Sequence, residues 1–223
     1  MCFSKKLVIL KLVSIDIIHL VMVLLIILIS MTFHEAMHAY ASYWLGDMTA
    51  KSQGRLTLNP IKHIDPFLSL LLPMLLAISG APIFGGAKPV PFNPNNVRYG
   101  EWGVAIVALA GPLTNLVLAF ILYGILSIFK VPSTVFIGQL FGTAIIVNLG
   151  FFVFNMIPIP PLDGSRVLYA LAPDFVRRGM EYVEQFGVFI VFVFVLIAGS
   201  TMGAFINAAI SLIVGVFSRF FML

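Results

Sequence analysis

The stretch IIHLVMVLLIILISMTFHEAMHA, residues 17–39, joins a long apolar run to three ionisable side chains at its end. The run from Ile17 to Phe33 carries no formal charge, and about 20 apolar residues suffice for a transmembrane helix. His34, Glu35 and His38 follow directly. Because ionisable groups are costly at membrane depth, they mark functional sites where they occur. We therefore expect a spanning helix over about 15–45 with a site near its C-terminal end.

The composition of the whole chain indicates a membrane protein. Of 223 residues, 61% are hydrophobic and 10% are charged, whereas a soluble domain has about 25% charged residues. The formal charge of +4 suits lipid headgroups and gives no indication of a nucleic-acid partner. Cys2 is the only cysteine, so no intramolecular disulfide can form. The expected class is an all-α, multi-pass integral protein of the cell membrane.

Further apolar segments predict a polytopic helical bundle of about five to six transmembrane segments. Strong spans are expected over 103–129 and 135–157. The apolar stretch 186–218 is interrupted by Gly199-Ser200-Thr201, which predicts two short helices there. No internal repeat and no soluble domain is visible.

The polar segment after the first span predicts a small β-hairpin or extended region. Residues 55–58 alternate like a short strand, and the prolines within 87–93 confine that stretch to extended or edge structure. Between them, 67–84 is uncharged but interrupted by Pro73. Its length makes it marginal as a membrane span.

His34, Glu35 and His38 form the pattern His-Glu-x-x-His. On a helix, residues four apart lie on one face and one turn apart, so both imidazoles can reach one Zn²⁺ ion. Glu35 then has the position of the general base in a metalloprotease. The alternative is that the three residues merely anchor a helix end at the membrane surface. The cost of placing such groups in a span favours the metal site.

A catalytic zinc site needs a third protein ligand and one open position. His19 lies about 22 Å from His34 along the helix and cannot supply that ligand. His63 lies in the turn-like stretch NPIKHIDP. Asp163 follows the second strong span, and its Asp-Gly-Ser context also suits a helix N-cap. The residues alone leave cap and ligand open for Asp163.

Three stretches together resemble the signature regions of site-2 proteases, the zinc intramembrane metalloproteases. They are HEAMHA (34–39), AGPLTN (110–115) and NMIPIPPLDG (155–164), and they occur in the order typical of that family. The resemblance extends over about 33–166. It implies one Zn²⁺ per chain and hydrolysis of peptide bonds within or near transmembrane segments of membrane-protein substrates. The chain resembles a compact form of the family without PDZ or CBS domains.

The resemblance also implies roles for individual residues. His34, His38 and Asp163 would be the zinc ligands, and Glu35 the catalytic base. Asn155 would help to hold the substrate or the developing oxyanion, a role that suits an amide donor. A helix-end cap is the alternative account of Asn155.

Substrate contacts are expected from the extended segments. A helical substrate must unwind before cleavage, and its backbone groups then need new hydrogen-bond partners. An exposed strand edge can supply them by β-addition, although the segments can equally form a hairpin of purely structural value. Asn115 matches a family position near the active site, where packing is an equal explanation. The candidate substrate-binding residues are Asn115, Arg55, Leu56, Asn59, Pro89 and Asn93.

We expect a single intramembrane metalloprotease domain over 1–223, with a catalytic core over about 15–166 and C-terminal helices over about 186–222. A membrane metal transporter and an inactive zinc-binding scaffold are the alternative functions. Transporters usually contain repeated halves, and none is visible here. Membrane lipid and a transmembrane substrate are the expected partners, and the oligomeric state stays open.

The implied ligand set constrains how the chain crosses the membrane. If one Zn²⁺ joins His34 and His38 to Asp163, the C-terminal ends of the first helix and of 135–157 share one side. This predicts that 67–84 is re-entrant and that the active site lies nearer the cytoplasm. The positive charges do not decide between the two arrangements. If 186–218 crosses the membrane twice, the count is 9 inside against 4 outside whether 67–84 is re-entrant or crosses.

Overall fold

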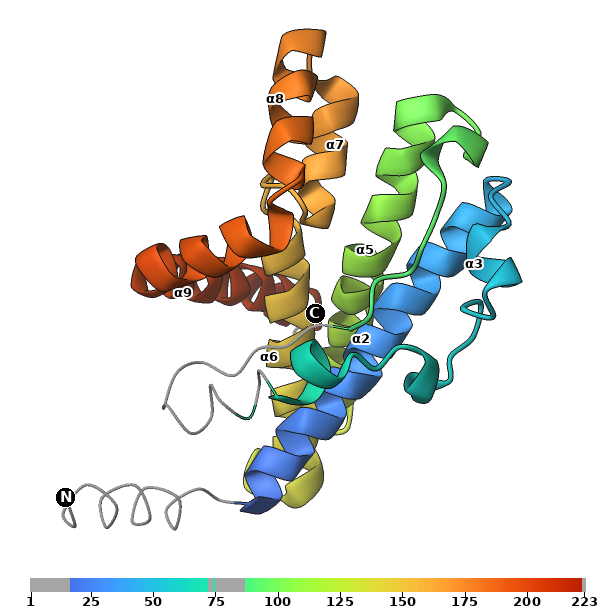
Figure 1. Cartoon of the computed structure of the whole chain (residues 1–223). Helices are drawn as coiled ribbons and strands as arrows, with labels where there is room; N and C mark the ends of the chain where they lie inside the picture. Colours follow the sequence, from blue (N-terminus) through green and yellow to red (C-terminus); the bar gives the residue numbers. More distant parts are fainter. Residues whose placement is uncertain (1–16, 72–73, 75–86, 222–223) are drawn as a thin grey trace, which may run out of the picture.

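The computed structural model describes residues 17–71, 74 and 87–221 and is helical in architecture. Three long helices pack side by side: α2 (Ile17–Trp44), α5 (Gly100–Ile128) and α6 (Phe136–Asn155). Figure 1 shows α2 and α6 running in the same direction, with α5 antiparallel to both. The predicted all-α membrane fold is therefore confirmed in its class.

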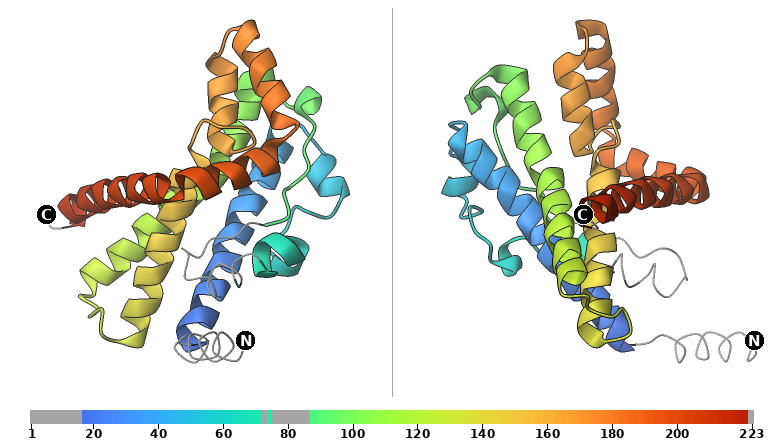
Figure 2. Two further views of the ribbon diagram at one scale, coloured as in Figure 1. Left: turned by 60° about the vertical axis from the view of Figure 1, so that its left-hand side comes forward. Right: turned by 180° about the vertical axis from the view of Figure 1, so that it is seen from behind.

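Shorter helices and one further long helix complete the described part. They are α3 (Thr49–Ser52), η1 (Pro60–Lys62), η2 (Pro66–Leu71), η3 (Pro94–Asn96), α7 (Asp163–Leu171), α8 (Asp174–Glu184) and α9 (Gly187–Phe221). Helices α7 and α8 pair beyond the end of α6, and α9 crosses α6 at a steep angle (Figures 1 and 2).

Four of the described helices are long and apolar enough to cross a membrane. They are Ile18–Trp44, Gly100–Ile128, Phe136–Asn155 and Gly199–Phe221. The predicted five to six spans are not found among the described residues. One cause is α9, which is a single helix where two short helices were predicted. A glycine costs a helix only about 1 kcal/mol, and an apolar environment strongly favours intact helical hydrogen bonds, so Gly199-Ser200-Thr201 does not end it.

The predicted β-hairpin is also not found, since the described residues contain no β-strand. The stretches 54–59 and 87–93 lie close together, and the Lys88 N–H donates to the His63 carbonyl at 2.9 Å. Pro89 and Pro91 have no N–H with which to continue a ladder. The two stretches therefore form an extended region rather than paired strands.

The segment between α2 and α5 begins and ends at the same end of the bundle. The Arg98 N–H donates to the Leu45 carbonyl at 2.8 Å, and the side chains of Ala41, Val97 and Val104 pack together. Residues 45 and 98, on either side of this segment, are therefore close together, and whether 67–84 is re-entrant stays a prediction. Within that stretch, 72–73 and 75–84 lie outside the described residues.

Apolar side chains cover both the interior and the surface of the bundle. Ala119, Leu149 and Phe217 belong to a buried cluster shared by α5, α6 and α9. On α2, the exposed residues Ile18, Val21, Leu25 and Ile29 recur every three to four positions, and so form one helix face. Exposed apolar faces of this kind are expected of helices that contact lipid.

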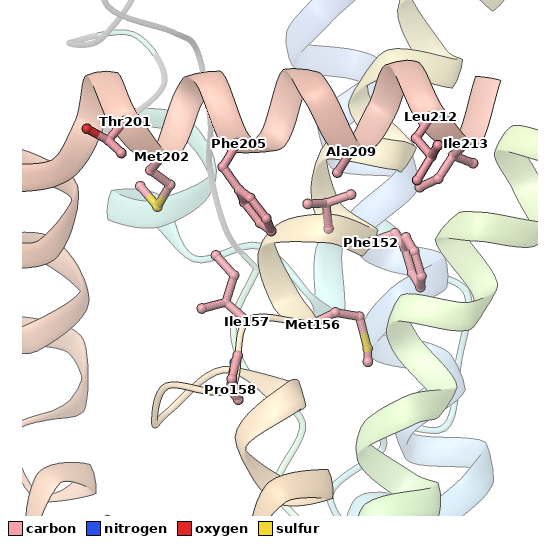
Figure 3. Close-up of a pocket in the computed structure, with 11 residues that line it drawn as sticks. Phe152, Met156, Ile157, Pro158, Thr201, Met202, Phe205, Ala209, Leu212 and Ile213 are labelled. Carbon is pink, nitrogen blue, oxygen red and sulfur yellow. The ribbon is translucent and has the colours of Figure 1, made fainter. Parts of the chain in front are cut away.

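An apolar cavity of about 640 Å³ lies between α6 and α9. Figure 3 shows Phe152, Met156 and Ile157, at the end of α6, on one side of the cavity, and Met202 and Phe205 of α9 on the other. The cavity begins beside the end of α6, where Asn155 precedes the loop to α7.

Candidate metal centre

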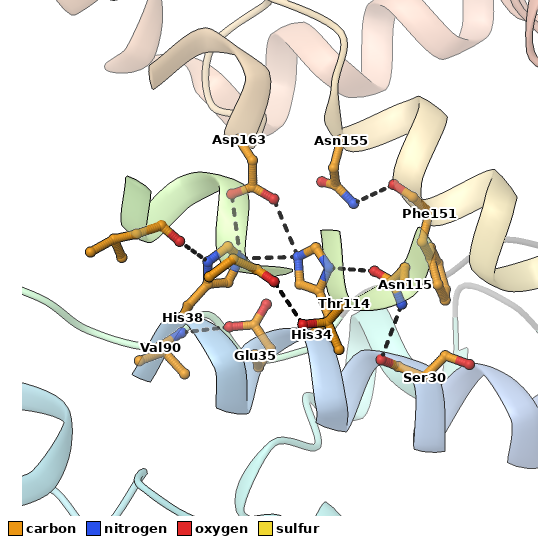
Figure 4. A network of polar contacts seen from close by, with 12 residues as sticks. Ser30, His34, Glu35, His38, Val90, Thr114, Asn115, Phe151, Asn155 and Asp163 are labelled. Carbon is orange, nitrogen blue, oxygen red and sulfur yellow. Dashed lines mark hydrogen bonds and ion pairs between the residues drawn. The ribbon is translucent and has the colours of Figure 1, made fainter. Parts of the chain in front are cut away.

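Two histidines of α2 and the first residue of α7 bring three donor groups together (Figure 4). The Nε2 atoms of His34 and His38 are 3.1 Å apart. Asp163 Oδ2 lies 3.2 Å from His34 Nε2, and Asp163 Oδ1 lies 3.5 Å from His38 Nε2. Ligands about 2.0–2.1 Å from a tetrahedral Zn²⁺ lie about 3.3 Å apart. The spacing and chemistry of these donors therefore fit one zinc ion.

Hydrogen bonds at the opposite ring nitrogens orient both imidazoles. His34 Nδ1 lies 2.6 Å from Asn115 Oδ1, and His38 Nδ1 lies 2.7 Å from the Val107 carbonyl. Both partners are acceptors, so each Nδ1 carries the proton. Each Nε2 lone pair is then directed at the shared centre, as in other metal-binding histidines.

A glycine of α5 makes room for the two rings. A Cβ atom at Gly111 would lie 2.4 Å from His38 Nε2 and 2.7 Å from His34 Cε1. Any side chain at this position would enter the space in which the donors meet. Gly111 of the AGPLTN stretch therefore makes room for the centre as well as for the packing of α5 on α2.

The carboxylate of Asp163 is directed at the histidines rather than at a helix end. Leu162 is the N-cap of α7 and makes no side-chain capping hydrogen bond. Gly164 lets the chain turn here, because a Cβ would lie 2.4 Å from the Met156 carbonyl oxygen.

Glu35 lies beside the three donors without being equivalent to them. A carboxylate oxygen of Glu35 is within 4.8 Å of the imidazole nitrogens. Its Oε2 accepts a hydrogen bond of 2.8 Å from the Val90 N–H. In Figure 4 the other carboxylate oxygen makes no hydrogen bond with any residue drawn. The geometry leaves that oxygen able to take a proton.

Two polar residues that were not predicted from the sequence, Asn148 and Ser30, support the histidines. Asn148 of α6 accepts a hydrogen bond of 2.9 Å from Asn115 Nδ2 and donates one of 2.9 Å to Ser30 Oγ. The Ser30 carbonyl in turn accepts a 3.4 Å hydrogen bond from Asn115 Nδ2. Asn148 could have been found, because a buried amide within a predicted span is itself a functional signal.

Comparisons with known proteins agree with this geometry. The family model described as "Peptidase family M50" matches residues 124–198, which include Asn155 and Asp163. The Bacillus subtilis protein named "Putative zinc metalloprotease YwhC" is 40% identical over 205 residues, which are 87% of this chain and 90% of that protein. The chain belongs to peptidase family M50.

Other members of the family are more distant or match a shorter part. The Mycolicibacterium smegmatis protein named "Putative zinc metalloprotease Rip2" is 36% identical over 76% of this chain and 64% of its own length. The Methanocaldococcus jannaschii protein named "Putative zinc metalloprotease MJ0611" is 50% identical over 62 residues, 28% of this chain and 31% of its own length. No solved structure matches the chain.

In this M50 member, Asn155 closes α6 next to the centre. Its Nδ2 donates to the Phe151 carbonyl at 3.0 Å, as expected of a residue at a helix end. An amide nitrogen carries two hydrogens, so one donor remains for another acceptor. Figure 4 shows Asn155 beside Asp163, above the histidine pair.

The residues predicted to bind substrate have different surroundings. Arg55 is only 6% exposed, and Leu56 packs near Val90. Asn59 and Pro89 are exposed, and Asn93 is half-buried. Asn115 is fully buried, with both ends of its amide hydrogen-bonded inside the fold.

Proposed function

We propose that this chain is an intramembrane zinc metalloprotease that hydrolyses peptide bonds within or near transmembrane segments of membrane proteins. One observation carries the proposal: two imidazole nitrogens and a carboxylate lie 3.1–3.5 Å apart in a bundle of apolar helices. Membership of peptidase family M50 supports it.

In this proposal His34, His38 and Asp163 hold one Zn²⁺ ion. Bound there, Zn²⁺ supplies Lewis acidity and makes water a nucleophile near neutral pH. Three protein ligands leave one position open, as in catalytic rather than structural zinc sites. Glu35 completes the site as a base and is not a ligand.

Glu35 moves the proton that hydrolysis requires. Its free carboxylate oxygen takes a proton as the water oxygen bonds to the scissile carbonyl carbon. The carbonyl oxygen then gains negative charge, and the remaining N–H of Asn155 donates to it. Glu35 gives the proton to the amide nitrogen as the C–N bond breaks, and an amine and a carboxyl group are released.

An unwound substrate segment would lie along the extended region. The exposed Asn59 and Pro89 and the half-buried Asn93 offer backbone groups for addition of an extended chain, with Leu56 beside them. Asn115 acts differently in this proposal, because its buried carbonyl oxygen orients His34.

We further propose that the centre faces the cytoplasm. Arg219 counts for neither side of the membrane, since α9 crosses the bundle steeply (Figure 2). If the segments 46–100 and 158–184 then lie inside, they contribute eight positive charges against four outside. The inner residues are Lys51, Arg55, Lys62, Lys88, Arg98, Arg166, Arg177 and Arg178, and the outer ones are Lys5, Lys6, Lys11 and Lys130. The stretch 67–84 is re-entrant in this arrangement.

Chemical labelling tests the orientation. In a Cys2→Ala background, Phe92→Cys would be labelled by a membrane-impermeant thiol reagent only in opened cells or inverted vesicles. Labelling of intact cells would refute the orientation without affecting the proposed chemistry.

The activity is tested with purified Glu35→Gln and a single-span membrane protein as substrate. The variant is expected to bind zinc like the wild type and to cleave no substrate above background. Glu101→Gln, which removes an exposed carboxylate of α5, is the matched control and should cleave normally. Equal cleavage by Glu35→Gln and wild type would refute the proposed protease mechanism. Zinc flux into vesicles without cleavage would favour the transporter, and zinc binding alone would favour the scaffold.

A further inference from the structure

Glu35 is held by a backbone amide that comes from outside the membrane helices. The bond of 2.8 Å from the Val90 N–H to Glu35 Oε2 is buried. Pro89 and Pro91 flank Val90 and have no N–H, so the Val90 amide is the only backbone donor among these three residues. Pro91 also restricts Val90 to an extended conformation. The orientation of Glu35 therefore depends on where residues 88–93, the strap, are held.

A buried arginine holds the N-terminal end of the strap. Arg55 Nη2 donates to the Lys88 carbonyl at 2.5 Å and lies 3.4 Å from His63 Nδ1. His63 is fully buried, and its Nε2–H donates to the Thr57 carbonyl at 2.9 Å. Since Nε2 carries the proton, Nδ1 is an acceptor and can receive the Arg55 hydrogen bond. Arg55 and His63 thus form a clamp two residues before Val90.

A buried aspartate holds the other end. The Asn93 N–H donates to Asp47 Oδ2 at 2.8 Å. Asp47 Oδ1 accepts hydrogen bonds from the N–H and the hydroxyl of Thr49 at 3.1 and 2.6 Å. Between the two ends, the Val90 side chain packs with Ala39 and Ala50. The strap is therefore fixed on both sides of the amide that binds Glu35.

The surroundings of Arg55 are unusual for a residue of purely structural value. Among the described residues, no carboxylate lies within ion-pair distance of its guanidinium. Its buried Nε has no hydrogen-bond partner there either. A buried cation without a paired charge is costly to the fold. The described contacts of Arg55 direct its charge at the strap rather than at a substrate outside.

We propose that Arg55 is a positioning residue for the catalytic base. By holding the Lys88 carbonyl, with His63 as its buried partner, it keeps the Val90 N–H on Glu35 Oε2. The second oxygen of Glu35 is then presented to the reacting water. The inference rests on the proposed role of Glu35 as base.

Kinetics distinguish this role from a substrate contact. Arg55→Met should lower kcat by up to about 100-fold, as expected when a catalytic group shifts by about 1 Å, with KM and zinc content almost unchanged. Arg55→Lys should restore part of kcat, because an ammonium group can also donate to the Lys88 carbonyl. Lys62→Met removes an exposed cation from the same segment and should be neutral. A raised KM with unchanged kcat would overturn the proposal, as would an activity loss that only matches lost folded protein.

The Val90 amide itself gives a second measurement that needs no activity. In enzyme labelled with ¹⁵N-valine, the Val90 amide resonance is assigned by its disappearance in Val90→Ile. Loss of the carboxylate in Glu35→Ala should move it upfield. Arg55→Met should move the Val90 resonance in the same direction. If Arg55→Met does not fold, Arg55→Lys takes its place and should move the resonance to a smaller extent. Lys62→Met should not move it. An unmoved resonance in folded Arg55 variants would overturn the clamp. If instead Glu35→Gln cleaves normally, the proposed function fails while this measurement still reports on the clamp.

Discussion

Gly111 of α5 lies directly against the His38 ring of α2: a Cβ atom at residue 111 would be 2.4 Å from Nε2 and 2.6 Å from Cε1. The contact is with the nitrogen proposed to bind zinc. Real Cβ atoms do not approach another atom so closely, and His38 cannot move away without losing the Val107 carbonyl at Nδ1. The position must therefore remain without a side chain for the imidazole pair to keep its geometry.

Gly111→Ala should lower zinc affinity and cleavage together, each by at least about tenfold, the size of effect seen when the support of a ligand is lost. Gly142→Ala is the matched control, because its Cβ would meet no atom within 4 Å. Zinc is measured by metal analysis after dialysis against a buffered zinc concentration. Normal zinc binding by Gly111→Ala would show that the rings meet elsewhere than in this geometry.

The support of His34 gives a second prediction. Asn115→Leu removes the acceptor at His34 Nδ1 and should weaken zinc binding by about 10- to 100-fold. Asn148→Leu leaves that acceptor in place and removes only the 2.9 Å partner of Asn115 Nδ2, so its effect should be smaller. Both are measured by competition with a chelator, and cleavage should recover at saturating zinc. If Asn148→Leu weakened zinc binding more than Asn115→Leu, the proposed order of support would be wrong.

The pattern of residues in the sequence predicted the centre better than it predicted the path of the chain. His34 and His38 could be paired because helical spacing alone places them one turn apart. The residues alone did not decide whether Asp163 is a helix N-cap or a zinc ligand, because nothing in the local sequence distinguishes the two roles. Only tertiary packing brings the start of α7 to the histidines, at 3.2 Å from His34 Nε2.

The extended region was predicted less well, for a physical reason. Alternation over 55–58 suggested a strand, but the partner stretch contains Pro89 and Pro91, which cannot donate to a ladder. The same prolines leave the Val90 N–H to a side-chain acceptor, Glu35 Oε2. The contact of Arg55 with the Lys88 carbonyl could not be predicted from the sequence, because the two residues are 33 positions apart.

The buried His63 predicts a pH-dependent stability. Burial has the largest effect and lowers the pKa of His63; the hydrogen bond to the Thr57 carbonyl raises it, the charge of Arg55 lowers it again and Glu35 raises it slightly, so that the pKa in the fold is below the usual value. The unfolded chain binds this proton near pH 6.5, above the pKa in the fold. The contribution of neutral His63 to stability is therefore fully present above about pH 6.5 and declines as the pH falls below it.

Thermal unfolding of wild type and His63→Gln measures this contribution. The wild type should be the more stable protein at about pH 7.5, and the difference in Tm should shrink towards about pH 5.5. Using the difference cancels the titration of groups that both proteins share. A difference that is constant, or that grows on acidification, would contradict a lowered pKa for His63.

Removal of the metal should loosen the link between α2 and α7. The centre joins His34 and His38 to Asp163, so a ligand that binds only the folded state adds stability by mass action, about 2.7 kcal/mol at one hundred times Kd. Chelation should therefore lower Tm, and added Zn²⁺ should restore it. Asp163→Ala removes one of three ligands and should show a much smaller Tm response to zinc, whereas Glu35→Gln should respond like the wild type. A full response from Asp163→Ala would exclude its carboxylate as a ligand, and a lost response in Glu35→Gln would make Glu35 a ligand instead of a base.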